Sequence, residues 1–151
     1  MPFDTHTKWM NKALAIAQNE LKKGNYPCCC LIVKNNREVG IGISSDKDAT
    51  THAEMEAIRK VSKNLHNYKL RGCVLYSTIE PCLMCAVAMN YAGISKVIYG
   101  CSHGEYGKKK TFDLLREIGI AKKIMVEEGI EERKAKTLLN RFESKYGKVN
   151  H

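Results

Sequence analysis

An apolar run, a helical segment and a second apolar run follow one another over residues 73–100, and this order strongly constrains the fold. "CVLYST" (73–78) has the length and character of a buried strand. Pro81 suits the first turn of a helix, which is predicted to continue through "CLMCAVAMNYA" to Gly93. "KVIYG" (96–100) is the next strand. Because a strand, a helix and a strand in so few residues form a βαβ unit, the two strands are predicted to be parallel neighbours.

The flanking segments extend this unit into a larger α/β domain. The other predicted elements are helices over residues 10–21, 53–63 and 112–118, and strands over residues 28–33, 38–43 and 123–126. The turn at 34–37 joins the first two strands as a hairpin. A final helix is predicted to bury Ala135, Leu138, Leu139, Phe142 and Tyr146. We therefore expect one domain over residues 1–151, with helices on both faces of a mixed sheet of about five strands.

Composition limits the class of protein. Of the 151 residues, 44% are hydrophobic, and no apolar run approaches the roughly 20 residues that span a bilayer. The N-terminus lacks a basic start followed by an apolar core, so we expect a cytosolic protein without a membrane partner. The net charge of +9 fits an anionic partner such as nucleic acid, and fits a lysine-rich surface equally well.

Cys82 and Cys85 are the first candidates for chemistry. They are three residues apart at a predicted helix start, where the helix dipole stabilises the thiolate form that binds metal. His52, at another predicted helix start, is the best third ligand for a zinc ion. Three protein ligands leave one position for water, as in catalytic zinc sites. Glu54 would then lie beside that water and carry its proton.

Each half of this pattern has an alternative explanation. Thr51 and Glu54 also match a capping box, in which the glutamate bonds back to the start of its own helix. A lone C-x-x-C is typical of a redox pair or of two buried thiols as well. The combination of H-x-E with P-C-x-x-C, each opening a predicted helix, favours the zinc site.

The other cysteines and histidines are predicted to play no part in this chemistry. Cys28, Cys29 and Cys30 follow one another on a strand, so their side chains alternate between faces and cannot converge on one ion. We expect them, like Cys73 and Cys101, to be small buried hydrophobic residues. His66 and His103 have no partners at recognisable spacing and are predicted to face solvent.

The motifs resemble those of the cytidine/deoxycytidylate deaminase superfamily, and most of all its bacterial tRNA-adenosine deaminase branch. "DATTHAEMEAIRK" is similar to D-P-T-A-H-A-E, "LYSTIEPCLMCAVAM" to L-Y-V-T-L-E-P-C-x-M-C-x-x-A-M, and "YPCCCLIV" to P-V-G-A-V-x-V. The resemblance implies a three-layer α/β/α cytidine-deaminase-like fold and a homodimer. It also implies zinc (Zn²⁺) bound by His52, Cys82 and Cys85, with Glu54 as general acid and base.

Three departures from those motifs concern the substrate. Ser44 stands where the family usually has a base-contacting asparagine, and Cys29 and Cys30 replace Gly-Ala in the first strand. The loop after residue 100, usually R-D-x-K-T-G-A, reads "CSHGEYGKKK" and ends in Lys108, Lys109 and Lys110, which are candidates for phosphate contact or for a solvated loop. The candidate substrate contacts are Ser44, Cys30 and Ala53.

The expected function is hydrolytic deamination of adenosine to inosine in a tRNA, with release of ammonia. A second hypothesis keeps the chemistry but uses a free base or nucleoside of the guanine or cytosine class. A third is a deaminase fold that survives as a non-catalytic binding subunit. A redox protein built on C-x-x-C is a distant fourth.

Overall fold

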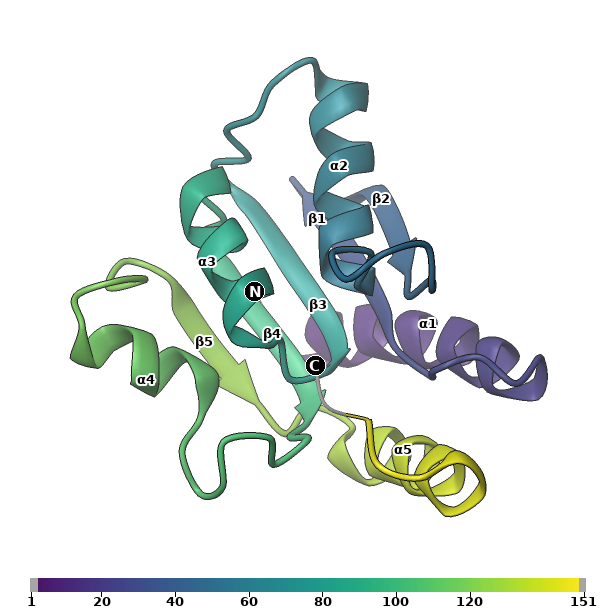
Figure 1. The fold of residues 1–151 in the computed structure, drawn as a ribbon. Coiled ribbons are helices and arrows are strands. Elements are labelled where there is room, and N and C mark those ends of the chain that lie inside the picture. Colours follow the sequence, from purple (N-terminus) through teal and green to yellow (C-terminus); the bar gives the residue numbers. More distant parts are fainter. Residues whose placement is uncertain (1–2, 150–151) are drawn as a thin grey trace.

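A five-stranded mixed sheet forms the centre of the computed structural model, which describes residues 3–149 (Figure 1). The spatial order is β2-β1-β3-β4-β5. Strand β1 pairs antiparallel with β2 and β3, whereas β3, β4 and β5 run parallel. The strands are β1 (Cys29–Lys34), β2 (Arg37–Ile43), β3 (Cys73–Ile79), β4 (Lys96–Cys101) and β5 (Met125–Glu128). The predicted parallel pair, now β3 and β4, is confirmed.

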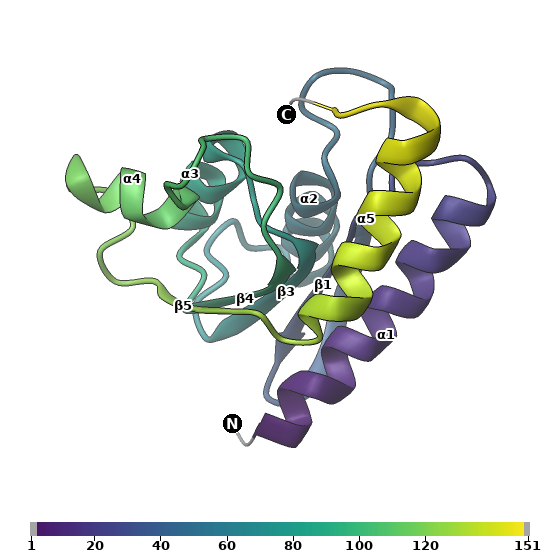
Figure 2. The same ribbon diagram turned by 90° about the horizontal axis from the view of Figure 1, so that it is seen from below.

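Five helices cover the two faces of the sheet. Helices α1 and α5 lie side by side on one face, and α2, α3 and α4 lie on the other (Figure 2). Their bounds are α1 (Phe3–Lys22), α2 (Ala53–Leu65), α3 (Leu83–Ala92), α4 (Thr111–Glu117) and α5 (Glu132–Tyr146). This is the three-layer α/β/α arrangement that the sequence predicts.

The hairpin of β1 and β2 closes through a two-residue turn. Lys34 pairs with Arg37, and the intervening Asn35 and Asn36 both have positive φ, at 51° and 59°. Two left-handed residues in succession give a type I′ turn, whose twist matches that of the flanking strands. Asparagine tolerates this conformation better than most residues, so the sequence "KNNR" selects the turn.

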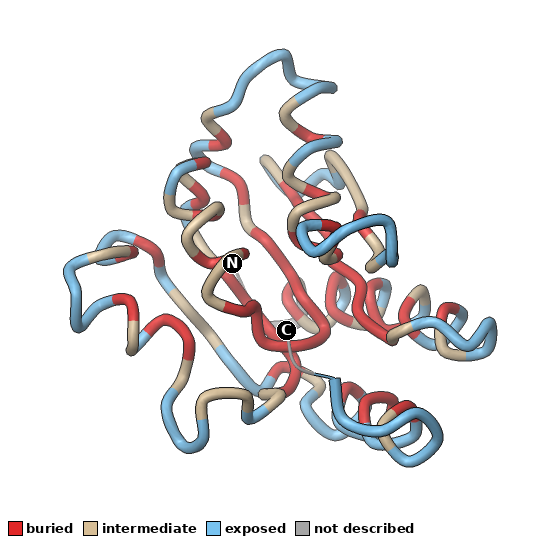
Figure 3. The backbone as a smooth tube through the Cα atoms, in the orientation of Figure 1, coloured by how far each residue is buried: buried red, intermediate tan, exposed pale blue. Residues whose placement is uncertain are grey.

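Burial is concentrated on the central strands, as the red segments of Figure 3 show. The first five residues of β1 and most of β3 and β4 are buried, because helices cover both of their faces. Strand β2, at the edge, is largely exposed or half-buried. Among the described residues, no helix is both long and apolar enough to cross a bilayer.

Most predicted element boundaries differ from the observed ones by a few residues. Helix α1 starts at Phe3 instead of residue 10, and β5 starts at Met125 instead of residue 123. Helix α3 starts at Leu83, two residues after Pro81, so the proline precedes the helix. The prediction that Tyr146 is buried is wrong: it is 50% exposed, because it is the last residue of α5, although its ring still packs against Phe142. The other four predicted core residues of α5 are buried.

Helix α2 lies unusually close to the hairpin, because Gly40 and Gly42 of β2 have no side chains. A Cβ atom on Gly42 would lie 2.1 Å from the Ala53 carbonyl oxygen and 2.4 Å from the Ala57 backbone nitrogen. A Cβ atom on Gly40 would lie 2.4 Å from one methyl group of Val61. The two glycines therefore determine how closely α2 packs against the hairpin.

Gly42→Ala should destabilise the protein more than Gly40→Ala. The Gly42 clash is with helix backbone, which can move only as a unit, so we expect a loss of about 3 kcal/mol in the free energy of unfolding. The Gly40 clash is with one methyl group and should cost about 1–2 kcal/mol. Urea denaturation measures both values.

Val61→Ala serves as the control for this comparison. It removes the methyl group that Gly40→Ala would strike, so the two substitutions together should cost less than their sum. Val61→Ala should bring no such relief to Gly42→Ala. Equal relief for both glycine variants would contradict the assignment of the Gly42 clash to the backbone.

Candidate active site

The starts of helices α2 and α3 meet at the carboxyl end of β3. His52 is the N-cap residue of α2, and Cys82 is the N-cap residue of α3, with Cys85 in the first turn. The donor atoms of both N-cap residues face the space between the two helix starts. Ligands of open α/β sheets bind at the carboxyl ends of parallel strands, which is where these residues lie.

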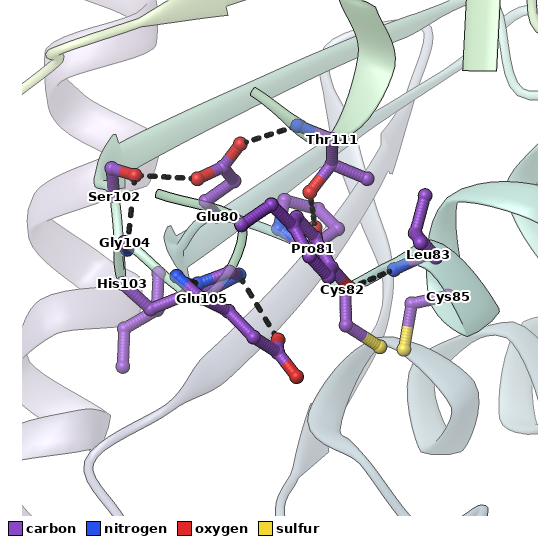
Figure 4. A network of polar contacts seen from close by, with 12 residues as sticks. Glu80, Pro81, Cys82, Leu83, Cys85, Ser102, His103, Gly104, Glu105 and Thr111 are labelled. Atoms are coloured by element: carbon purple, nitrogen blue, oxygen red, sulfur yellow. Dashed lines mark hydrogen bonds and ion pairs between the residues drawn. The ribbon is translucent and has the colours of Figure 1, made fainter. Parts of the chain in front are cut away.

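His52, Cys82 and Cys85 converge on one point. The His52 Nδ1 atom is 3.4 Å from the Cys82 sulfur and 3.5 Å from the Cys85 sulfur, and all three donor atoms lie within 4.8 Å of one another. Figure 4 shows the two sulfur atoms side by side. A tetrahedral zinc ion with Zn–S of about 2.3 Å and Zn–N of about 2.0–2.1 Å separates sulfur from nitrogen by about 3.5 Å. The three side chains therefore fit one zinc ion.

The surroundings favour the charged form of Cys82. A hydrogen bond from the Cys85 thiol is the largest cause of its lowered pKa, and bonds from His52 and from the Cys85 backbone N–H add to it. The same contact with Cys82 raises the pKa of His52. A thiolate at a helix N-terminus is the form of cysteine that binds metal.

Glu54 is buried and turned into the protein, not back toward the start of its helix. Glu54 is only 4% exposed, and its Oε1 atom accepts a hydrogen bond of 2.9 Å from the Ser77 hydroxyl. Thr51 donates instead to carbonyl oxygens of the preceding loop, on Ser45 and Asp48, at 2.9 Å each. The capping-box alternative is therefore wrong, and the burial of Glu54 needs another explanation.

A small pocket opens beside the three donor atoms. Its volume is about 20 Å³, which is the room that one water molecule needs. The lining residues are Tyr26, Cys28, Ser44, His52, Glu54, Ile79, Glu80, Cys82 and His103. Of the three predicted substrate contacts, Ser44 lies in this lining. Cys30 and Ala53 are fully buried behind it and do not reach the pocket surface.

Cys28 has a role in the pocket that sequence reasoning missed. It is buried, as predicted, but it precedes β1 instead of lying within it, and its thiol is 3.4 Å from Glu54 Oε1. Burial raises the pKa of this thiol, and the nearby Glu54 charge raises it further, so the thiol keeps its proton. The prediction that Cys28 is a small buried residue outside the metal donors is confirmed, and the contact with Glu54 is an addition to it. Cys73 and Cys101 are buried as predicted.

His103 was predicted to face solvent, and that prediction is wrong. Its side chain is 8% exposed, and it lines the pocket. The loop after β4 turns back over the site through Gly104 and Gly107, both with positive φ. A single histidine in a polar loop forms no sequence pattern from which its position in the pocket could be predicted. His66, the other histidine predicted to face solvent, is exposed at the end of α2.

Glu80 fastens that loop to the cysteine motif (Figure 4). One of its carboxylate oxygens accepts a hydrogen bond of 2.6 Å from the Ser102 hydroxyl, and the other accepts one of 2.8 Å from the Thr111 backbone N–H. The Thr111 hydroxyl donates to the Pro81 carbonyl oxygen at 2.6 Å. Glu80 is 3% exposed, so these donors compensate the burial of its charge.

The same loop also caps helix α3. The Leu83 backbone N–H, which has no partner within its own helix, donates to the Tyr106 hydroxyl at 2.9 Å. At the end of the loop, Lys109 pairs with Glu117 at 3.3 Å and Lys110 with Glu128 at 3.8 Å, while Lys108 is exposed. One side of the loop therefore contacts the site, and the other side carries the lysines.

Comparison with known proteins agrees with this geometry. The model of the cytidine and deoxycytidylate deaminase zinc-binding region matches residues 3–101. The tRNA-specific adenosine deaminase of Streptococcus pyogenes serotype M18 is 34% identical over 136 residues, which cover 86% of each chain. The tRNA-specific adenosine deaminase 2 of Xenopus tropicalis is 42% identical over 108 residues, or 66% of this chain. Those residues span 64% of the Xenopus protein, less than two thirds of its length.

Solved structures share the fold. One of a tRNA:A34 deaminase superposes with a TM-score of 0.76 at 28% identity, and covers 88% of this chain and 99% of its own. The guanine deaminase of Nitrosomonas europaea gives a TM-score of 0.75 at 17% identity, over 89% of this chain and 82% of its own. At that identity the second likeness concerns the fold alone.

Glu80→Ala should loosen the loop that covers the site. It removes the acceptor of the Thr111 N–H, and hydrogen bonds to charged groups are worth roughly 1.5–3 kcal/mol, so amide exchange at Thr111 should accelerate about 10- to 100-fold. Hydrogen exchange followed by NMR measures this rate directly.

Glu80→Gln is the matched variant. Its amide oxygen can accept from Thr111 while its NH₂ group donates to the Ser102 hydroxyl, so the exchange rate at Thr111 should rise far less than in Glu80→Ala. Equal acceleration in both variants would mean that the charge of Glu80, not its hydrogen bonds, holds the loop.

Proposed function

The chain belongs to the cytidine and deoxycytidylate deaminase family, and we propose that it deaminates adenosine to inosine in tRNA. The observation that carries the proposal is the convergence of His52, Cys82 and Cys85 beside the buried carboxylate of Glu54. A structural zinc site has no need of that carboxylate, which argues for an enzyme over a non-catalytic binding subunit.

In this proposal His52, Cys82 and Cys85 hold the zinc ion of the family. When bound, the ion would supply the lowering of a water's pKa toward about 7. Glu54 would hold the proton that passes from water to the departing nitrogen, so one carboxylate would serve as base and then as acid. The net reaction consumes adenosine and water and yields inosine and ammonia.

The substrate assignment has two supports. Relatives at 42% and 34% identity are tRNA-specific adenosine deaminases, and the chain carries a net charge of +9. The exposed Lys108 lies on the loop that covers the site, where it suits contact with phosphate. An adenosine flipped out of its stack would place its base against the pocket, with Ser44 in contact with it. Cys30 and Ala53 shape the wall behind the lining.

The proposal extends to assembly and location. The resemblance to the family supports a homodimer, and the exposed apolar side chains Tyr91, Ile118 and Met125 supply surface for one. We place this dimer in the cytosol and treat residues 1–151 as one domain. Light scattering on the purified protein determines the number of subunits.

Zinc-loaded protein should convert adenosine to inosine in a tRNA transcript at low salt. Because Lys and Arg contacts to phosphate release counterions, the activity should fall steeply as salt rises from about 50 to 200 mM. Inosine is measured by nucleoside mass spectrometry of the digested RNA, and ammonia release is followed in parallel.

A panel of free bases and nucleosides, tested in the same ammonia assay, separates the proposal from its main alternative. Release from guanine or cytosine but not from tRNA would overturn the tRNA assignment and favour a free-base deaminase, for which Ser44 in place of the usual asparagine is the motivation. Release from neither would favour a binding subunit.

Glu54→Ala should abolish turnover and leave zinc bound, because Glu54 is not one of the three converging donors. We expect a loss of about 10²–10⁴-fold in kcat, the range of general acid–base catalysis. Cys82→Ser removes a donor and should lower the zinc content instead. Zinc per chain is measured by atomic emission after gel filtration, and zinc loss in Glu54→Ala would contradict the division of roles.

A further inference from the structure

Two polar side chains lie behind Glu54, on the side away from solvent. Ser77 is in strand β3 and is fully buried, and Cys28 precedes β1 and is 4% exposed. Neither is among the three converging metal donors, and sequence reasoning assigned no role to Ser77. Both side chains touch the same oxygen atom of Glu54.

The contacts are specific to that oxygen. The Ser77 hydroxyl lies 2.9 Å from Glu54 Oε1, and the Cys28 sulfur lies 3.4 Å from it. Ser77 and Cys28 are also 3.8 Å apart, so the three groups form one compact cluster. The thiol keeps its proton, as its raised pKa indicates, and is a weak donor.

The Ser77 hydroxyl has a second acceptor within reach. The Ile79 carbonyl oxygen lies 2.6 Å away, and the hydroxyl has one hydrogen to give. Hydrogen bonds to a charged acceptor are the stronger ones, so the hydroxyl donates to Glu54 when that carboxylate is ionised. The Ile79 carbonyl oxygen competes for that one hydrogen, and its short distance keeps the Ser77 hydroxyl close to both acceptors.

Both of these side chains contact Oε1, so Oε2 is the oxygen that they do not hold, and the carboxylate also makes a hydrogen bond with the Cys85 thiol, one of the three metal donors. A carboxylate with one fixed oxygen has a fixed plane, so the direction in which Oε2 presents its lone pairs is also fixed. Proton transfer to and from a water depends steeply on such geometry, and displacements of about 1 Å can cost 10²-fold in rate. A hydrogen bond that fixes the orientation of Glu54 would therefore increase the rate of proton transfer.

We propose that Ser77, assisted by Cys28, is a positioning residue that orients the Glu54 carboxylate for proton transfer. The inference rests on the proposed deaminase function, since Glu54 is the proton carrier only in that reaction. It concerns this chain in particular. The motifs that the sequence resembles have valine at both positions, in P-V-G-A and in L-Y-V-T, so an apolar pair is replaced here by two donors.

Ser77→Ala tests the proposal by removing the hydroxyl alone. On whichever substrate the protein turns over, kcat should fall about 10- to 100-fold, with KM and zinc content within about twofold of the parent values. Ser77→Thr keeps a hydroxyl and should recover most of that loss. Cys28→Ala should lower kcat less than Ser77→Ala does, since a thiol is the weaker donor.

Thr78→Val is the matched control. Thr78 is the next residue of β3, so it points to the opposite face, and its buried hydroxyl accepts from the Cys29 backbone N–H at 3.1 Å. Loss of this hydroxyl should lower stability and leave kcat nearly unchanged. An equal fall in kcat for Thr78→Val and Ser77→Ala would overturn the proposal, because any buried hydroxyl would then have the same effect.

Crystal structures of the parent protein and of Ser77→Ala give a readout that needs no activity. The Glu54 carboxylate should rotate away from its parent position in the variant, and an unmoved carboxylate would overturn the proposal. If the parent protein released ammonia from no substrate, the proposed function would fail. The carboxylate position would still decide whether Ser77 orients Glu54.

Discussion

The contact between helix α2 and the β1–β2 hairpin is the constraint on which the site depends. Gly42 lets the Ala53 carbonyl approach so closely that no side chain fits between strand and helix. His52 caps this helix and Glu54 lies in its first turn, so a displacement of α2 would move both residues together. Cys82 and Cys85 belong to a different helix, after β3. The zinc geometry therefore depends on two independent packings against one sheet.

The site contains two buried carboxylates, Glu80 and Glu54, whose hydrogen-bond partners are distributed differently over their two oxygens. Glu80 has both oxygens hydrogen-bonded, to Ser102 and Thr111, and serves to hold the loop. Glu54 has the Ser77 and Cys28 contacts on a single oxygen. The first arrangement ties the loop to the cysteine motif, whereas the second leaves Oε2 as the oxygen that Ser77 and Cys28 do not hold. Their hydrogen bonds thus distinguish two glutamates of similar burial.

Local patterns predicted the elements and the metal donors, because those depend on neighbours in the sequence. H-x-E and P-C-x-x-C each sit at the start of one helix, so their spacing already brings the donors to a helix end. The positions of Cys28 and Ser77 depend on contacts across 23 to 49 residues of chain and left no local pattern. The loop that carries His103 is held over the site by Tyr106, whose hydroxyl accepts from Leu83, 23 residues away. The capping-box alternative failed for the same reason, since the bond from Ser77 comes from a distant strand.

The loop after β4 links the metal donors to the surface that meets a substrate. The His103 Nδ1 atom accepts a hydrogen bond of 2.8 Å from the Glu105 backbone N–H, so in the neutral ring the proton is on Nε2. That N–H is buried, and Glu105 Oε2 lies 3.7 Å away, beyond hydrogen-bond distance. A buried donor without a protein acceptor carries a cost of about 1–3 kcal/mol that a water or ligand removes. His103 on the loop side and Ser44 on the hairpin side therefore both bring polar atoms to the lining of the pocket.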